Sequence, residues 1–96
     1  VKIVWTEVAI QDLKTIFDFI AGNSSRYAGI TANRIYQKVQ LLTHNPEAGR
    51  IVPELNRQSV RELIEGNYRI IYKRRSKSQV DILRIYHSTR LMRKIK

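Results

Sequence analysis

The chain has 96 residues, enough for one domain with a modest core, and it has no cysteine, which excludes disulfides and thiolate metal sites. Hydrophobic residues make up 43% and charged residues 27% of the chain, a composition that excludes both a disordered and a membrane protein. Apolar runs fall short of the roughly 20 residues that span a bilayer, and the N-terminal segment has no signal-peptide pattern. We therefore expect a single cytoplasmic domain over residues 1–96 that uses no metal and no cofactor.

The net charge of +10 is unevenly distributed along the chain. Residues 1–56 hold six Lys and Arg against five Asp and Glu, whereas residues 57–96 hold twelve against three. A domain with one nearly neutral and one strongly basic half favours an anionic partner, such as nucleic acid, an acidic protein or an anionic membrane surface. The alternative is a charge that serves solubility alone.

The N-terminal half predicts a strand followed by two helices. The segment "KIVW" at residues 2–5 has the β-branched and aromatic character of a short strand. Thr6 occupies the N-cap position of a helix with apolar residues at helical spacing, and Gly22 is expected at its C′ position. Ser24 or Ser25 caps a second helix, which ends at "HNPEAG" because proline cannot continue it. The short polar connection predicts an antiparallel helix hairpin.

The C-terminal half predicts three strands after a loop that spans Pro46 to Arg57. The expected strands are Val60–Glu65, Tyr68–Arg74 and Val80–His87, joined by the short turns "GN" and "SKS". The resulting order β-α-α-β-β-β predicts an α+β fold, in which the N-terminal helix hairpin packs on a small, mostly antiparallel sheet.

Alternation along the last strand places apolar residues on both of its faces. Val80, Ile82 and Tyr86 share one face, and Leu83 and Ile85 share the other. This pattern indicates a central strand that is covered on both sides, at least in part.

The same alternation places groups that can bind phosphate beside aliphatic neighbours. Arg61 shares a face with Leu63, Arg69 with Ile71, and His87 with Leu83 and Ile85. Arginine offers a planar fork that matches phosphate oxygens, and histidine can transfer a proton near neutral pH.

Together with Glu54, these residues form a plausible set for RNA cleavage. The carboxylate would be the base, the arginines would stabilise charge at phosphorus, and His87 would be the acid. Each residue also has a structural interpretation: Glu54 can pair with an arginine, and His87 can be a hydrogen-bonded residue at a strand end. Tyr68 and Tyr72 could stack on bases, but aromatic residues are also ordinary strand residues.

Arg69 allows two distinct interpretations. We expect it to serve function, because Ile70 and Ile71 can supply the packing of this strand. An unpaired buried charge is costly, so a buried Arg69 would need a carboxylate, and Glu54, Glu62 and Glu65 are the candidates nearby in sequence.

Nearly the whole chain resembles the RelE/ParE superfamily, the toxins of type II toxin–antitoxin modules. The similarity runs through "WTEVAIQDLKTIFDFIA" and "NPEAGRIVPEL" and is strongest in "VRELIEGNYRIIYKRRSKSQVDILRIYHSTR". The order of Arg-Glu-Leu, Tyr-Arg-Ile-Ile-Tyr and His-x-x-Arg is similar to the ParE-like branch in particular. Members of the superfamily share a helix hairpin packed on a small antiparallel sheet.

The resemblance implies one of two activities. ParE-like members poison DNA gyrase, and RelE-like members cut mRNA on the ribosome. Glu54, Arg61, Arg69 and His87 match positions that one ribonuclease branch uses, which would make Glu54, Arg69 and His87 catalytic. Ser88 and Thr89 depart from that branch, which has an aromatic residue near its end. We favour gyrase inhibition, with mRNA cleavage or a non-toxic nucleic-acid-binding module as alternatives.

The resemblance also implies partners. We expect a cognate acidic antitoxin, a homodimer or a heterotetramer with that antitoxin, and either gyrase or the ribosome and its mRNA as target, with no membrane contact. The candidate target-binding residues lie in the basic half: Arg61, Tyr68, Arg69, Tyr72, Arg84, His87 and Arg90.

Overall fold

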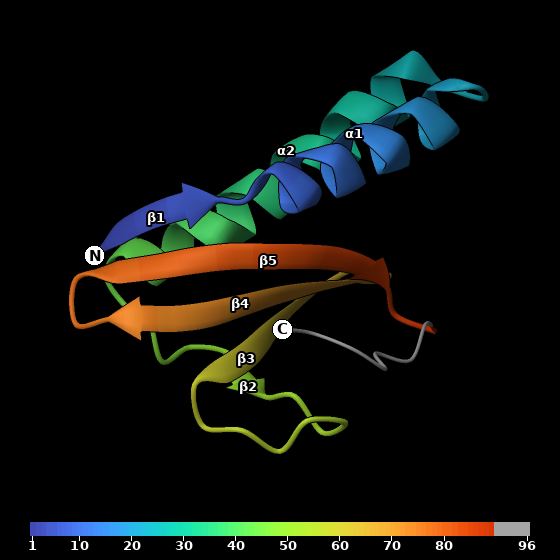
Figure 1. The fold of residues 1–96 in the computed structure, drawn as a ribbon. Helices are drawn as coiled ribbons and strands as arrows, with labels where there is room; N and C mark the ends of the chain where they lie inside the picture. Colours follow the sequence, from blue (N-terminus) through green and yellow to red (C-terminus); the bar gives the residue numbers. More distant parts are fainter. Residues whose placement is uncertain (90–96) are drawn as a thin grey trace.

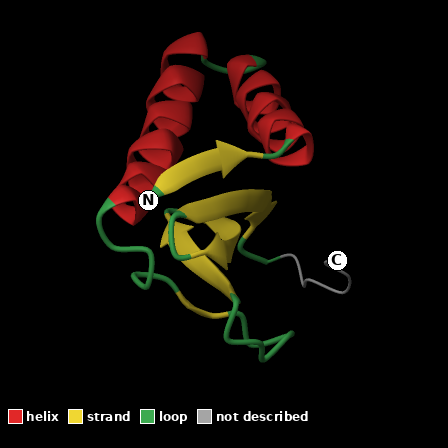
Figure 2. Ribbon diagram, turned by 60° about the vertical axis from the view of Figure 1, so that its left-hand side comes forward, coloured by secondary structure: helices red, strands yellow, loops and turns green. Residues whose placement is uncertain are grey.

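The computed structural model describes residues 1–89 and contains the predicted strand, two helices and later strands in that order. The strands form one sheet in the order β1-β5-β4-β3-β2, and both helices lie on the same side of it (Figures 1 and 2). The strands are β1 (Lys2–Trp5), β2 (Arg50–Ile51), β3 (Val60–Glu65), β4 (Tyr68–Ser76) and β5 (Gln79–His87). The predicted α+β fold is confirmed.

The helix hairpin forms from α1 (Glu7–Ala21) and α2 (Ser25–Gln40), which a short 3₁₀ turn, η1 (Leu41–Thr43), extends. Thr6 caps α1, since its side-chain oxygen accepts a hydrogen bond from the backbone N–H of Ala9 at 3.1 Å. Ser24 caps α2 in the same way, with Tyr27 as the donor at 3.1 Å. The closed end of the hairpin projects beyond the sheet (Figures 1 and 2).

Gly22 differs from its predicted position. It is the C-cap of α1 with φ −58°, a right-handed conformation, and not a left-handed C′ residue. The backbone N–H groups of Asn23 and Ser24 both bond to the carbonyl of Ile20, which ends the helix in a tightened last turn. The reversal therefore needs no positive φ.

The sheet is antiparallel except at β1. Strand β1 pairs in parallel with the first half of β5, from Lys2 opposite Gln79 to Trp5 opposite Ile82. The remaining pairs, β5 with β4, β4 with β3, and β3 with β2, are antiparallel. Because β1 ends at Trp5, the outer edge of β5 has no strand partner from Leu83 onward within residues 1–89.

The segment predicted as a loop contains β2, which pairs Arg50 with Glu62 and Ile51 with Arg61. Two residues are too few to produce an alternating pattern, so the sequence gives no strand signal here. A compact turn follows, in which Asn56 adopts φ 50° and its N–H bonds to the carbonyl of Val52 at 2.9 Å. Asparagine tolerates this left-handed conformation better than most residues.

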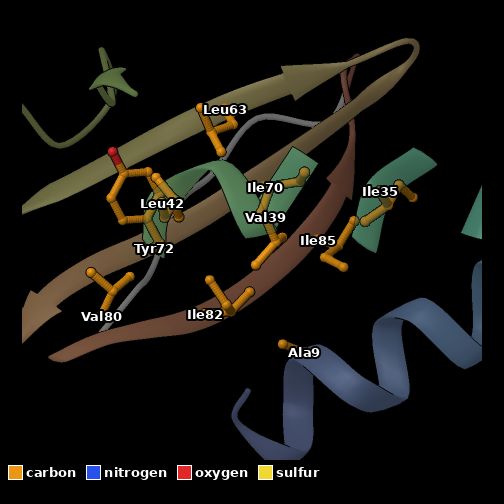
Figure 3. Packing of buried hydrophobic residues seen from close by; sticks show 10 residues of the cluster. All are labelled: Ala9, Ile35, Val39, Leu42, Leu63, Ile70, Tyr72, Val80, Ile82 and Ile85. Carbon is orange, nitrogen blue, oxygen red and sulfur yellow. The ribbon is translucent and has the colours of Figure 1, made fainter. Parts of the chain in front are cut away.

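Apolar side chains cover both faces of the sheet. The larger cluster lies between the sheet and the helices (Figure 3), and its buried members are Ala9, Ile35, Val39, Leu42, Leu63, Ile70, Tyr72, Val80, Ile82 and Ile85. The smaller cluster lies on the opposite face, which we call the far face, and its buried members are Val52, Val60, Ile71 and Tyr86. Covering of β5 on both sides is thus confirmed.

The division of residues between the faces of β5 is not the predicted one. Ile85 joins Val80 and Ile82 in the helix-side cluster, whereas Tyr86 and the half-buried Leu83 belong to the far face. The register shifts between Ile71, which pairs with Arg84, and Tyr72, which pairs with Ile82. This irregularity adds one residue to β5, so strict alternation fails beyond Ile82 and Leu83 does not share the face of His87.

Candidate functional site

Arg69 lies at the centre of a buried ion cluster on the far face. Its side chain is 6% exposed, and its Nε donates to Oε1 of Glu62 at 2.7 Å. The two terminal nitrogens donate to the two carboxylate oxygens of Glu54 at 2.7 and 2.8 Å. This bidentate fork is the strongest form of an arginine–carboxylate contact. The structure therefore corresponds to the buried, paired interpretation of Arg69.

The cluster extends to the edge of the sheet through Glu62. The side chain of Glu62 is fully buried, and its second oxygen accepts a hydrogen bond from Nε of Arg50 at 2.6 Å. The hydrogen bonds to Glu54 and Glu62 raise the pKa of Arg69 above its ordinary value, so the guanidinium is permanently charged. Within residues 1–89, every buried side-chain nitrogen and oxygen has a hydrogen-bond partner.

Glu54 reaches Arg69 because its turn is anchored on the far face. The neighbouring Val52 is fully buried in the smaller cluster, and Leu55 packs against the same cluster. These two apolar residues fix the turn, and the carboxylate between them points at the guanidinium with its side chain 20% exposed. The sequence-based alternative in which Glu54 pairs with an arginine is what the structure contains.

His87 lies on the face opposite to Arg69. The register pairs His87 with Tyr68 and Arg69 with Tyr86, and neighbouring positions on a strand point to opposite faces. The His87 ring meets Tyr68 edge-on at a centroid distance of 5.8 Å, and its Nδ1 lies 2.9 Å from Oγ1 of Thr89. The structure does not bring Glu54, Arg69 and His87 together as one set.

Arg61 and Tyr72 hold the loop that precedes β2. Arg61 donates to the carbonyl of Gly49 at 3.0 Å and forms an ion pair with Glu47 at 3.2 Å. The Tyr72 hydroxyl accepts from the N–H of Gly49 at 2.8 Å and donates to the carbonyl of Pro46 at 2.9 Å. Tyr72 is fully buried, and this burial raises the pKa of its phenol. The folded chain therefore exposes no part of Tyr72 to a target, as its predicted role in target binding would require.

Arg84 is tied to the helix hairpin at the open edge of β5. Two of its nitrogens donate to Asp12 at 2.8 and 3.1 Å, and its guanidinium lies 4.8 Å from the centre of the Tyr86 ring. Asp12 also accepts from the backbone N–H of Ile85 at 2.9 Å, so a side chain occupies part of the edge that β1 leaves open. The bond to Asp12 raises the pKa of Arg84.

A cavity of about 320 Å³ opens between α1 and the end of β5. Its walls include His87 and Tyr68 from the predicted set, together with residues that the sequence did not single out. Phe19 is the most exposed of these at 79%, and it is not among the α1 residues that pack on the helix-side cluster, which are Ala9, Leu13 and Ile16. The sequence signal for this cavity is Phe19, an aromatic residue on the side of α1 that does not pack on the core. The full lining is Asp12, Thr15, Ile16, Phe19, Tyr68, Ile85, Tyr86 and His87.

The remaining predictions concern Arg90, metal binding and membrane contact. Arg90 lies beyond residue 89, and its placement is not described. Residues 1–89 contain no cluster of three or more His, Cys, Asp or Glu that could hold a metal ion. No described helix combines the length and apolar character needed to cross a bilayer.

Comparisons with known proteins agree with this architecture. The ParE toxin family of the type II toxin–antitoxin system parDE matches residues 3–92. A solved structure of the chromosomal ParDE TA system from P. aeruginosa superposes with a TM-score of 0.75 at 24% sequence identity, covering 90% of this chain and 94% of that chain. The comparison with curated protein sequences gives no match. Because the family match spans nearly the whole chain, this protein belongs to the ParE toxin family of type II toxin–antitoxin systems.

Proposed function

We propose that this chain arrests growth by inhibiting DNA gyrase and that a cognate antitoxin neutralises it. The observation that carries the proposal is the ParE family match over residues 3–92. The geometry of the ion cluster supports gyrase inhibition over mRNA cleavage. Glu54 is engaged by Arg69 in a bidentate pair, and His87 lies across the sheet from both. A base and an acid so divided do not converge on one ribose phosphate.

Exposed apolar side chains on the helix hairpin support a protein partner. Ile10, Phe19, Tyr27 and Tyr36 are between 47% and 79% exposed, and all four lie on α1 or α2. Exposed apolar residues that gather on one part of a small protein are typical of a binding surface. We infer that an antitoxin covers this hairpin and enters the cavity between α1 and β5.

Controlled expression in a bacterial host tests the toxic activity. Growth should stop and the DNA-damage response should be induced, because blocked gyrase leaves broken DNA. Co-expression of the neighbouring antitoxin gene should restore growth, and a copy of the toxin gene with an early stop codon is the matched control. Normal growth at verified levels of soluble, folded protein would contradict the proposal.

The same host separates the two activities of the superfamily. If the chain cut mRNA instead, translated messages would be cleaved and the DNA-damage response would stay uninduced. Replacing the acid by His87→Gln would then lower cleavage about 10²–10⁴-fold, since the leaving oxygen would lose its proton donor. Growth arrest by the proposed route should not depend on proton transfer by His87.

A further inference from the structure

Four cations gather where the far face meets the β4–β5 turn. Lys73 and Arg75 lie on β4, Lys2 lies on β1, and Lys77 lies in the turn. Lys73 follows Tyr72 of the helix-side cluster and Lys2 precedes Ile3, which packs on that cluster, so alternation turns both lysines to the far face. Both helices lie on the other side of the sheet (Figure 2). We call these four residues the basic sheet face.

One carboxylate stands among these cations. Asp81 pairs across the strands with Lys73 and accepts hydrogen bonds from Arg75 at 2.8 Å and Gln79 at 2.8 Å. Burial alone would raise the pKa of Asp81, but the two hydrogen bonds and the charges of Arg75 and Lys73 outweigh it and lower the pKa. Asp81 thus forms an ion pair with Arg75, whose side chain is still 54% exposed. The surface keeps an excess of positive charge.

The spacing of the cations suits a regular row of phosphates. Lys73 and Arg75 are two residues apart on one strand, which separates them by about 7 Å. Strands are about 4.8 Å apart, so Lys2 on β1 lies roughly two strand spacings from β4. One DNA strand presents a phosphate about every 3.4 Å along the helix axis, so cations at this spacing can each meet a phosphate of the duplex backbone.

The apolar side chains that a protein or a single strand would need lie elsewhere. The large exposed hydrophobic residues of the described chain are on α1, α2 and η1, with Ile64 on β3. Protein interfaces depend on buried apolar or aromatic anchors, and single-stranded nucleic acid is held by aromatic stacking. A surface of cations without aromatic residues is suited to the backbone of duplex DNA, whose bases are already stacked.

We propose that the basic sheet face is a binding surface for duplex DNA, which it contacts through phosphates without reading sequence. It is separate from the helix hairpin, so an antitoxin and DNA can be held at the same time. The inference stands whether or not gyrase is the target. Were gyrase the target, this surface would add contacts to the DNA that the enzyme holds.

Fluorescence anisotropy of the purified full chain with a short labelled DNA duplex tests the proposal. Wild-type affinity should fall steeply with salt, because each neutralised phosphate contributes about 0.9 to the slope of log K against log salt. The double variant Lys73→Ala/Lys77→Ala should lower that slope by about 2, so the loss of affinity between about 50 and 200 mM salt becomes about tenfold smaller. A second variant, Lys2→Ala/Lys77→Ala, should do the same and covers the case in which the loss of Lys73 unfolds the chain.

The matched control is Lys14→Ala/Arg26→Ala, which removes the same charge from exposed positions on α1 and α2. Its salt slope should equal that of the wild-type chain. Equal effects of the control and the sheet variants would show that net charge alone acts and would overturn the assigned surface. Absence of duplex binding at about 50 mM salt would also overturn it, as would at least tenfold tighter binding of a single strand of the same length.

Discussion

At the scale of single residues, Arg69 illustrates how one side chain can be both charged and structural. Its guanidinium donates hydrogen bonds to Glu54 and Glu62, and Glu62 also accepts a hydrogen bond from Arg50. Buried ion pairs often stabilise a protein no more than apolar residues of the same size, but breaking one leaves an uncompensated charge. The cluster therefore fixes the arrangement of the turn at Glu54 and of β2 on β3.

Replacing Arg69 by alanine should destabilise the chain strongly. Arg69→Ala leaves Glu54 and Glu62 without their shared cation, and loss of one partner in a buried pair costs about 3–5 kcal/mol. Denaturant unfolding measures the change. Arg57→Ala, in an exposed part of the loop before β3, is the control and should stay within about 0.5 kcal/mol of the wild-type chain.

A double-mutant cycle separates the pair from other effects of the substitution. Arg69→Ala combined with Glu54→Gln should show a coupling of about 0.5–3 kcal/mol, as is typical for residues in contact. Loss of toxicity in Arg69→Ala should follow the loss of folded protein. A variant that keeps wild-type stability and yet loses toxicity would contradict this interpretation and assign Arg69 to the target.

At the scale of elements, the loop before β2 depends on one hydroxyl. Tyr72 reaches from β4 to Gly49 and Pro46, and Gly49 is held so closely that an added Cβ would lie 2.6 Å from the carbonyl oxygen of Glu62. A side chain at this position would require the backbone to move. The loop and β2 are therefore set on β3 and β4 by packing that is distant in sequence.

Tyr72→Phe should loosen this loop without changing the sheet. The buried N–H of Gly49 loses its acceptor, and an unsatisfied buried donor costs about 1–3 kcal/mol. Hydrogen exchange at the Gly49 amide should accelerate. Exchange at the amides of β4 and β5 should change only as much as the free energy of global unfolding changes. Tyr27→Phe, at an exposed tyrosine of α2, is the control and should change neither quantity. Unchanged exchange at Gly49 in Tyr72→Phe would contradict the role assigned to the hydroxyl.

The elements that the sequence predicts are those with strong local signals. The capped helices and the three long strands carry periodic apolar residues, and their bounds agree within a few residues with the structure. Strand β2 has no local signal, and the extra residue in β5 has none either, because both follow from pairing with β3 and β4. That irregularity is why Tyr86 and Ile85 lie on faces opposite to those expected from alternation.

The partners of Arg69 were predictable from the sequence, but the arrangement of the selected residues was not. Sequence reasoning selected Glu54, Arg69 and His87, and it offered an ion pair for Glu54 as an alternative. Whether Glu54 pairs with Arg69 or is exposed depends on the burial of Arg69. That burial depends on the turn that Val52 and Leu55 anchor on the far face. Asp12 and Arg84 are 72 positions apart in sequence and form an ion pair at the edge of β5. The sequence alone could not predict this pair, because only the fold brings the two residues together.

At the scale of the whole molecule, charge and apolar surface are segregated. Within residues 1–89, the hairpin carries most of the exposed apolar side chains, and the strands of the sheet carry most of the Lys and Arg residues. A small protein with two such surfaces can hold two partners of different chemistry, a protein on the hairpin and a polyanion on the sheet. This division agrees with a toxin that is masked by an antitoxin and acts where DNA is handled.

Gyrase is the proposed target, and a supercoiling assay with purified proteins shows whether the chain inhibits it. Purified chain is added to gyrase with relaxed plasmid, and in parallel to translating ribosomes, each with and without the cognate antitoxin. We predict that supercoiling is blocked, that the antitoxin restores it, and that the mRNA stays intact. Cleaved mRNA together with unimpaired supercoiling would contradict the account and assign the chain to the ribonuclease branch.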